Sequence, residues 1–390
     1  MSSKPNMMLK DLAETHGTPL YVYDSSVLKT QISRLKRLHF PYGGLVRYAM
    51  KANHHPGILA EVKKAGLGID ASSSYEAVAA LDAGFEPGQV LLTSQQSPHN
   101  MAELVDKGVQ FNATSLRQIE LYGQAARGGK ISLRFNPGIG SGLAGKINVG
   151  GGASSFGIWH EYFDEAIELA DKYDLEVVRV HTHIGSGTEL AVWAQAVDLT
   201  LGLAEKIPSS KTVNFGGGYK VAITPDEEDT PIEKVGKMID SKLVDFHEKT
   251  DRQLQAEVEP GKFVAMNAGV LLARVDDVVD TGPEGYRYVK LDTGMSDFLR
   301  PALYAAEHVI EVVQDESSDG ETGDFVVVGH CCESTDVLTV ARGDSSKIRP
   351  IRLENVKIGS LVVVRGAGAY CASMRAVGFN GFPLAKEVLV

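Results

Sequence analysis

The sequence predicts an α/β protein, a closed (β/α)8 TIM-type barrel followed by a separate C-terminal β-domain. Between about residues 44 and 262, eight short β-branched runs alternate with segments of helical period. After about residue 265 the segments are β-rich without regular helices, which predicts the second domain. We therefore expect the barrel to span residues 27–268. Residues 1–26 and 269–390 are expected to form a β-sandwich or β-barrel-like domain.

The eight expected barrel strands are short, apolar and bounded by Gly, Pro or polar residues. They cover residues 45–52, 67–73, 89–94, 111–115, 131–136, 177–185, 212–218 and 254–260. Helices are expected between them, for example over 55–66, 74–84 and 162–174. Residues 18–26 are strand-like and precede the barrel. We expect this segment to pair with the β-domain and so to tie the two ends of the chain together.

The composition excludes several classes of function. The net charge is -11 and no block of Lys or Arg stands out, which argues against nucleic-acid binding. Three cysteines, with Cys331 and Cys332 adjacent, are too few for a disulfide framework and indicate a reducing compartment. The N-terminal segment is charged where a signal peptide would be apolar, and no stretch is long enough to span a membrane. These features predict a cytoplasmic protein that acts on a small molecule.

Unusual residues gather at the expected ends of different barrel strands. Lys51, Asp70, His183, Gly216 to Gly218 and Glu259 each follow or end such a strand. Barrel active sites lie where the C-terminal ends of the strands meet. The sequence therefore predicts one site that is shared by these residues.

Lys51, in the segment YAMKANHHP, has two interpretations. Most lysines are solvated, so it could be an ordinary turn residue. A lysine that is partly withdrawn from water at a barrel mouth could instead form a Schiff base with an aldehyde cofactor. The neighbouring strand-end residues favour the second interpretation.

The segment HTHIGSG also allows two interpretations. Two imidazoles on one face of a strand could bind a metal, although no third ligand accompanies them. Alternatively, His183 stacks on a flat cofactor while Ser186 and nearby backbone amides bind phosphate. We favour stacking and expect no metal.

Two further strand ends fit a phosphorylated ring cofactor. The glycines Gly216, Gly217 and Gly218 would let backbone amides approach phosphate oxygens, although a tight turn explains them equally well. Gly261 would complete the phosphate site. Glu259 could be a surface residue before a turn, or it could face a pyridine nitrogen and keep it protonated. A protonated ring is a strong electron sink and favours loss of a carboxylate over racemisation.

The β-domain contributes the segments GHCCESTDV and GAGAYCASM. Taken alone, their cysteines and Tyr370 could be buried packing residues. In the functional interpretation, Cys332 donates a proton, Glu333 binds a substrate amine and Tyr370 donates its hydroxyl to phosphate.

Taken together, the motifs YAMKAN, GIDASSSYE, HTHIGSG, FGGGY, EPGKF, RPALY, CCESTDV and GAGAYCASM resemble the fold-type III decarboxylases that depend on pyridoxal 5'-phosphate (PLP). Among these the sequence is most similar to the diaminopimelate decarboxylases. The resemblance covers nearly the whole chain, in order, and implies an alanine racemase-like fold. It also implies the conversion of meso-2,6-diaminopimelate to L-lysine and carbon dioxide.

The resemblance implies a role for each matching residue. Lys51 would hold the cofactor, His183 would stack on its ring, and Glu259 would face its nitrogen. Catalytic residues would be Lys51, His183 and Cys332. Cofactor-binding residues would be Lys51, Asp70, Arg134, His183, Ser186, Gly216, Gly217, Gly218, Glu259, Gly261 and Tyr370, with Glu76 nearby. Substrate-binding residues would be Lys262, Arg300, Tyr304, Glu333 and Tyr370. The loop of Cys332 and Glu333 would enter the neighbouring subunit's site, which implies a head-to-tail homodimer.

Two positions depart from the family pattern. Lys262 replaces the arginine of EPGR and offers a single ammonium in place of a bidentate fork. Phe379 replaces the tyrosine of a YN pair, while Asn380 is retained. These departures keep open a decarboxylase of another basic amino acid or conjugate, such as ornithine, lysine or a siderophore or polyamine precursor. A non-catalytic PLP-binding homologue is a further alternative.

Overall fold

The chain folds into two units. The computed structural model describes residues 3–138, 152, 154–183, 187–314 and 320–390. The barrel unit comprises Lys29–Val221 and Glu228–Val264. The sheet unit comprises Met1–Leu28, Ala222–Glu227 and Ala265–Val390.

Eight parallel strands close the barrel unit, in the circular order β2-β3-β4-β5-β6-β8-β9-β10. A short strand, β7 (Ile158–Trp159), pairs with β6 outside this circle. The barrel strands are β2 (Gly44–Ala49), β3 (Gly68–Ala71), β4 (Val90–Leu92), β5 (Gln110–Ala113), β6 (Lys130–Asn136), β8 (Glu176–Thr182), β9 (Thr212–Asn214) and β10 (Gln255–Val258). All eight coincide with predicted strands, so the (β/α)8 barrel is confirmed.

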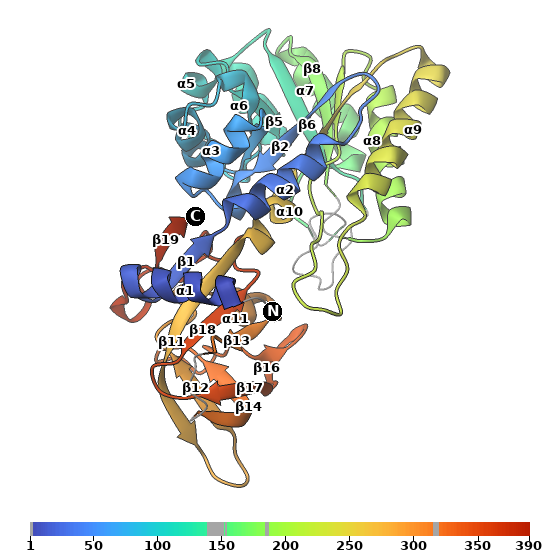
Figure 1. Cartoon of the computed structure of the whole chain (residues 1–390). Helices are drawn as coiled ribbons and strands as arrows, with labels where there is room; N and C mark the ends of the chain where they lie inside the picture. Colours follow the sequence, from blue (N-terminus) through green and yellow to red (C-terminus); the bar gives the residue numbers. More distant parts are fainter. Residues whose placement is uncertain (1–2, 139–151, 153, 184–186, 315–319) are drawn as a thin grey trace. The chain divides into compact units, whose positions relative to one another are not determined.

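Helices alternate with these strands and cover the barrel from outside (Figure 1). Local signals set their starts, because Ser73 and Ser115 accept hydrogen bonds from backbone N–H groups of the first turn and Pro56 opens α3. The helices are α2 (Ser25–Lys36), α3 (Pro56–Lys64), α4 (Ser74–Asp82), α5 (Met101–Asp106), α6 (Leu116–Ala125), α7 (Phe163–Lys172), α8 (Leu190–Glu205), α9 (Ile232–Thr250) and α10 (Lys262–Ala265).

A layer of buried charge fills the barrel interior beneath the strand ends. Glu257 accepts hydrogen bonds from Arg47 at 2.8 and 2.9 Å and from Arg179 at 3.0 Å. Gln110 accepts from both guanidinium groups, at 3.0 and 2.7 Å. Burial raises the pKa of Glu257, but the two arginines more than offset it, so the pKa is lowered and the carboxylate is ionised. Glu257 is therefore satisfied within this layer.

The sheet unit is built on an eight-stranded sheet with the path β13-β18-β11-β12-β14-β17, in which β1 is added beside β11 and β19 beside β1. The strands are β1 (Leu20–Tyr23), β11 (Gly269–Asp280), β12 (Arg287–Leu291), β13 (Ile310–Val312), β14 (Glu321–Val328), β17 (Ile351–Val356), β18 (Leu361–Arg365) and β19 (Lys386–Leu389). A separate hairpin joins β15 (Val340–Ala341) and β16 (Asp344–Ile348), and the helices are α1 (Ser3–His16) and α11 (Arg300–Tyr304). The separate β-rich domain is confirmed.

Both chain ends meet in the sheet unit, as the sequence predicts. Strand β1 pairs antiparallel with β11 and parallel with β19, with Leu20 opposite Leu272 and Lys386 (Figure 1). Beneath this pairing Leu20, Val22 and Leu272 belong to one buried apolar cluster with residues of α1. No helix within the described ranges is long and apolar enough to cross a membrane.

Candidate active site

Six strands that are neighbours around the barrel carry the residues of the candidate site. Around the barrel the order β6-β8-β9-β10-β2-β3 places Arg134, His183, the Gly216 turn, Glu259, Lys51 and Asp70 on neighbouring strand ends. The sequence separates these residues widely, and the closed sheet gathers them at its C-terminal rim. The predicted barrel residues that the structure describes therefore lie at the same end of the barrel.

Lys51 lies half-buried in a 3-10 turn, η1 (Met50–Ala52), directly after β2. Burial raises the pKa of the Asp70 carboxyl, and the Lys51 ammonium is the strongest influence that opposes this rise. The Lys51 charge also acts on Glu259, on Glu76 and on His183. Lys51 thus lies beside buried carboxyls, which a solvated turn lysine would not do.

Glu259 is a buried carboxyl of the rim. It is 4% exposed, and its Oε1 accepts a hydrogen bond of 2.6 Å from Nδ2 of Asn214. Burial raises its pKa and the neighbouring Asp70 raises it further, while Lys51 and Arg134 oppose the rise. The site therefore favours a protonated carboxyl, and a cation placed beside Glu259 would return it to the ionised form.

Arg134 points into the same polar region from β6. It is 6% exposed, and its guanidinium lies 5.5 Å from the centre of the Phe156 ring. Burial lowers the pKa of Arg134, and Glu259 and Asp70 oppose that shift. Burial also lowers the pKa of His183, and the positive charges of Arg134 and Lys51 lower it further, so its imidazole is neutral.

The glycine turn after β9 leaves room that side chains would fill. A Cβ on Gly216 would lie 2.9 Å from Cβ and Cγ of His183, and a Cβ on Gly217 would lie 2.5 Å from the backbone oxygen of Glu259. Gly216 and Gly218 also adopt positive φ angles of 68° and 102°. Backbone packing and conformation thus require glycine here, and the turn lies against the His183 ring.

Gly261 serves a close approach between two strand ends. A Cβ at this position would lie 3.0 Å from Cβ of Ala52 and 3.1 Å from the backbone oxygen of Ala49. The turn after β10 therefore packs directly on the turn that carries Lys51. Lys262 follows it as the first residue of α10. Ser186 lies outside the described residues.

Several buried polar atoms of the barrel lack a hydrogen-bond partner among the described residues. Among them are Oδ1 of Asp70, Oδ1 of Asn112, Nε2 of His181 and the hydroxyl of Tyr219. Buried polar atoms are normally satisfied, so this set indicates a polar ligand. A phosphorylated pyridine aldehyde fits the donor set, because Glu259 can face a ring nitrogen, Lys51 an aldehyde and the glycine turn a phosphate.

His181 is one of the two histidines of the possible metal pair, and its ring contacts other side chains inside the barrel. Nδ1 lies 2.6 Å from Nδ2 of Asn112, and Nε2 lies 3.5 Å from Oε2 of Glu259. Burial lowers the pKa of His181 well below its usual range, with Arg134 as the next contribution. The ring is a neutral neighbour of Glu259.

In the sheet unit, the loop of Cys332 and Glu333 is exposed and internally organised. The backbone N–H of Cys332 donates to Oδ1 of Asn380 at 2.8 Å, and the buried Asp336 accepts from the N–H of Cys331 at 2.9 Å. Glu333 accepts from the N–H and hydroxyl of Thr335, and these bonds lower its pKa. The loop therefore presents a thiol and a carboxylate on a fixed backbone.

Arg300 opens α11 and is 9% exposed. Its Nε donates a 3.2 Å hydrogen bond to Nε2 of His308, whose other ring nitrogen lies 2.9 Å from the backbone oxygen of Arg365. The guanidinium carbon lies 5.9 Å from the centre of the Tyr304 ring. Arg300 and Tyr304 therefore lie together, while Tyr370 has a left-handed φ of 55° after β18.

Sequence reasoning missed the residues that support the rim from below. Asn214 contacts Glu259, and the Arg47–Glu257–Arg179 layer contacts Asn214, yet none of these residues carries a motif of its own. The segment N-F-G could have indicated a role for Asn214, because an Asn side chain can accept a hydrogen bond from the backbone N–H two residues later. It does so here, at 2.8 Å from Gly216.

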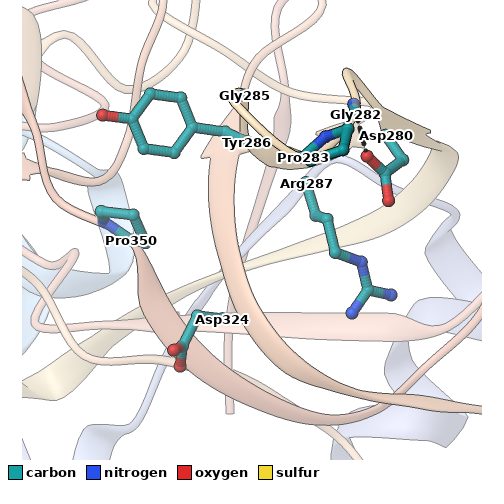
Figure 2. A pocket seen from close by; sticks show the side chains of 8 residues that line it. All are labelled: Asp280, Gly282, Pro283, Gly285, Tyr286, Arg287, Asp324 and Pro350. Atoms are coloured by element: carbon teal, nitrogen blue, oxygen red, sulfur yellow. Dashed lines mark hydrogen bonds between the residues drawn. The ribbon is translucent and has the colours of Figure 1, made fainter.

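A surface depression of about 710 Å³ lies elsewhere, in the sheet unit (Figure 2). It is lined by the β11–β12 hairpin together with Asp324 and Pro350. Asp280 accepts the N–H of Gly282 at 2.7 Å, and the guanidinium of Arg287 lies over the Phe325 ring at 4.3 Å. These polar groups serve the hairpin, so the depression does not compete with the barrel rim as the candidate site.

The rim and the two-unit fold define an enzyme class, and comparison with known families identifies it. A family model described as the pyridoxal binding domain of pyridoxal-dependent decarboxylases matches residues 27–266. The chain belongs to the pyridoxal-dependent decarboxylases, which are lyases.

Several similar proteins are named diaminopimelate decarboxylases. The Streptomyces coelicolor enzyme is 33% identical over 387 residues, covering 97% of this chain and 86% of that one. A crystal structure of diaminopimelate decarboxylase has a TM-score of 0.90 at 30% identity, covering 98% of this chain and 90% of that chain. The Helicobacter pylori enzyme, complexed with L-lysine, has a TM-score of 0.86 at 27% identity, covering 98% and 94%.

The raised pKa of Glu259 predicts a pH-dependent stability of the cofactor-free protein. A carboxyl whose pKa is higher in the folded than in the unfolded state binds more protons when folded. The stability that this carboxyl contributes is therefore lost as the pH rises from 4.5, the ordinary pKa of a glutamate, through the raised pKa of Glu259. Glu259→Gln should flatten this decline, measured as thermal unfolding midpoints from about pH 5 to about pH 8.

The exposed Glu165→Gln variant is the control and should keep the wild-type slope. An unchanged slope in Glu259→Gln would contradict the assignment of a raised pKa to this carboxyl.

Proposed function

We propose that this protein is a PLP-dependent decarboxylase that converts meso-2,6-diaminopimelate to L-lysine and carbon dioxide. The observation that carries the proposal is the adjacency of Lys51 and Glu259 on the rim, since an attachment amine and a buried carboxyl are what an electron-sink cofactor requires. The named relatives support diaminopimelate as the substrate, and the crystal structure from H. pylori contains the corresponding product, L-lysine.

Lys51 is the proposed attachment point of the cofactor aldehyde and the amine that later releases the product. PLP, when bound, supplies the ring that accepts the electron pair of the breaking carbon–carboxylate bond. Asp70 lies close enough to influence the Lys51 charge and would orient this ammonium. Arg134 adds a second fixed positive charge to the same region.

Glu259 is proposed to hold a proton at the ring nitrogen. Burial raises the pKa of this carboxyl, and a protonated ring nitrogen beside it would stabilise its ionised form. A carboxylate at this position makes the ring a strong sink, which suits decarboxylation. His183, neutral and packed beside the glycine turn, offers a flat face for stacking.

The remaining proposed contacts divide between cofactor and substrate. For phosphate we propose the backbone of Gly216 to Gly218, together with Ser186, Gly261 and Tyr370. Arg300 can donate to the distal carboxylate of diaminopimelate, and Tyr304 and Lys262 are proposed beside it. Glu333 is proposed to bind the distal amine. Cys332 is proposed to return a proton to the carbon that has lost its carboxylate.

The sheet unit supports a homodimer with shared sites. Cys332 and Glu333 are exposed, and apolar side chains of the neighbouring C-terminal segment are exposed with them, including Val377 at 70% and Phe379 at 37%. Asn380 connects the two segments through its bond to Cys332. Exposed apolar groups around a reactive loop are typical of an interface. We propose that this loop completes the site of a second copy of the chain.

The alternative is a decarboxylase of another basic amino acid or conjugate. Lys262 favours this alternative, because a single ammonium binds a carboxylate less specifically than an arginine fork. Arg300 favours diaminopimelate, since ornithine and lysine have no distal carboxylate for it to bind. A non-catalytic homologue is disfavoured because Lys51, Cys332 and Tyr370 are all present.

Lys51→Ala should abolish covalent cofactor attachment. The wild-type protein incubated with PLP should absorb near the violet edge of the visible spectrum, and the variant should lose that band. The exposed Lys64→Ala variant is the control and should keep it. A band of wild-type intensity in Lys51→Ala would show that another residue holds the cofactor.

Carbon dioxide release from a panel of amino acids tests the substrate. With meso-diaminopimelate, ornithine, lysine and arginine, we expect kcat/KM for diaminopimelate to exceed the others by at least about tenfold, because Arg300 pairs with a group that the others lack. Release from ornithine or lysine with none from diaminopimelate would establish the alternative.

Mixing two inactive variants tests the shared site. Lys51→Ala and Cys332→Ala subunits should form hybrid dimers in which one of the two sites is intact. Random exchange makes about half of the dimers hybrid, so we expect about a quarter of wild-type activity. Each variant alone is the control. No recovery, despite exchange shown by mass spectrometry, would indicate that each chain holds a self-contained site.

A further inference from the structure

We propose that Asn214 is a positioning residue that joins Glu259 to the glycine turn, and so couples the two ends of the cofactor subsite. This inference rests on the proposed function, because it concerns how the chain prepares its rim for the ring and the phosphate of PLP. Asn214 is the last residue of β9 and is fully buried.

The Asn214 amide makes three hydrogen bonds, which use both of its ends. Nδ2 donates to Oε1 of Glu259 at 2.6 Å and to Oε2 of Glu257 at 3.3 Å. Oδ1 accepts from the backbone N–H of Gly216 at 2.8 Å. One planar group therefore fixes the proposed partner of the ring nitrogen and the first residue of the proposed phosphate turn.

The orientation of this amide is determined by its surroundings. A flipped amide would place its oxygen against the ionised Glu257 carboxylate and its N–H against the N–H of Gly216, which would lose both of these hydrogen bonds. Beneath it, Glu257 cannot move away, because Arg47 donates to it at 2.9 Å and Arg179 at 3.0 Å. The buried ion layer thus anchors Asn214, and Asn214 in turn anchors Glu259.

The backbone also joins Glu259 to the glycine turn. The N–H of Glu259 donates to the oxygen of Gly216 at 2.9 Å, and the packing of Gly217 against the Glu259 carbonyl leaves no room for a Cβ. A displacement of the Glu259 backbone would therefore strain the turn. Asn214 also opposes the rise in the pKa of Glu259, so it favours the ionised carboxylate that a protonated ring needs.

The first test is the affinity of the cofactor-free protein for PLP. Asn214→Ala removes two hydrogen bonds to carboxyl groups and one to the turn, so we expect the dissociation constant to rise about ten- to hundredfold. Gln118→Ala is the matched control, because this buried amide likewise accepts from a backbone N–H, of Thr114, and donates to a backbone oxygen, of Ser94. It should change the constant less than about threefold.

The second test separates positioning from general loss of packing. If Asn214 acts through Glu259, the effect of Asn214→Ala on PLP affinity should be at least about threefold smaller in a Glu259→Ala background than in the wild type. The pH midpoint of the visible band should also shift in Asn214→Ala and stay constant in Gln118→Ala. Equal effects in both backgrounds, or equal behaviour of the two amide variants, would overturn the proposal.

A third variant keeps the test decisive if Asn214→Ala does not fold. Asn214→Ser leaves a smaller cavity and a hydroxyl that serves fewer partners, so an intermediate loss of affinity is expected. Wild-type affinity and band in Asn214→Ser would overturn the proposal. Failure of the proposed function is distinguishable, because the wild-type protein would then show no band that depends on Lys51.

Discussion

The pairing of β2 with β10 is the constraint on which the site depends. These strands are the first and the last of the barrel, and their parallel register, with Val46 opposite Val258, closes the sheet. Closure places the turn that carries Lys51 against the turn that carries Glu259, and Gly261 lets the two backbones touch. The proposed attachment lysine and a buried carboxyl from opposite ends of the barrel sequence thereby become neighbours. The chemistry of the rim follows from barrel topology.

Charge is organised in two layers inside this barrel. In the lower layer Glu257 is ionised and paired with two arginines, which satisfies it without a ligand. In the upper layer Glu259 has a raised pKa, and buried polar atoms near it lack partners among the described residues. Asn214 connects the layers. The rigid lower layer thus supports an upper layer whose unsatisfied groups are suited to a polar cofactor.

The sequence predicted the architecture well, because the patterns that indicate strands and turns lie within short segments of the chain. Alternating apolar runs and turn residues located all eight barrel strands, and the strand-end positions of Lys51, Asp70 and Glu259 were enough to expect a common rim. The supporting contacts were not predictable in the same way. Asn214 meets Glu257 and Glu259 only because β9 and β10 pair in one particular register. The bond between Arg300 and His308 likewise depends on side-chain directions that spacing does not determine.

The central claim is that Lys51 is the residue to which PLP attaches. Reduction of the PLP-loaded protein with borohydride would fix the cofactor to its lysine, and mass mapping of peptides would locate it. We expect the added mass on the peptide that contains Lys51, in proportion to the loss of the visible band. The same mass on the peptide that contains Lys262, or on another lysine in place of Lys51, would contradict the account.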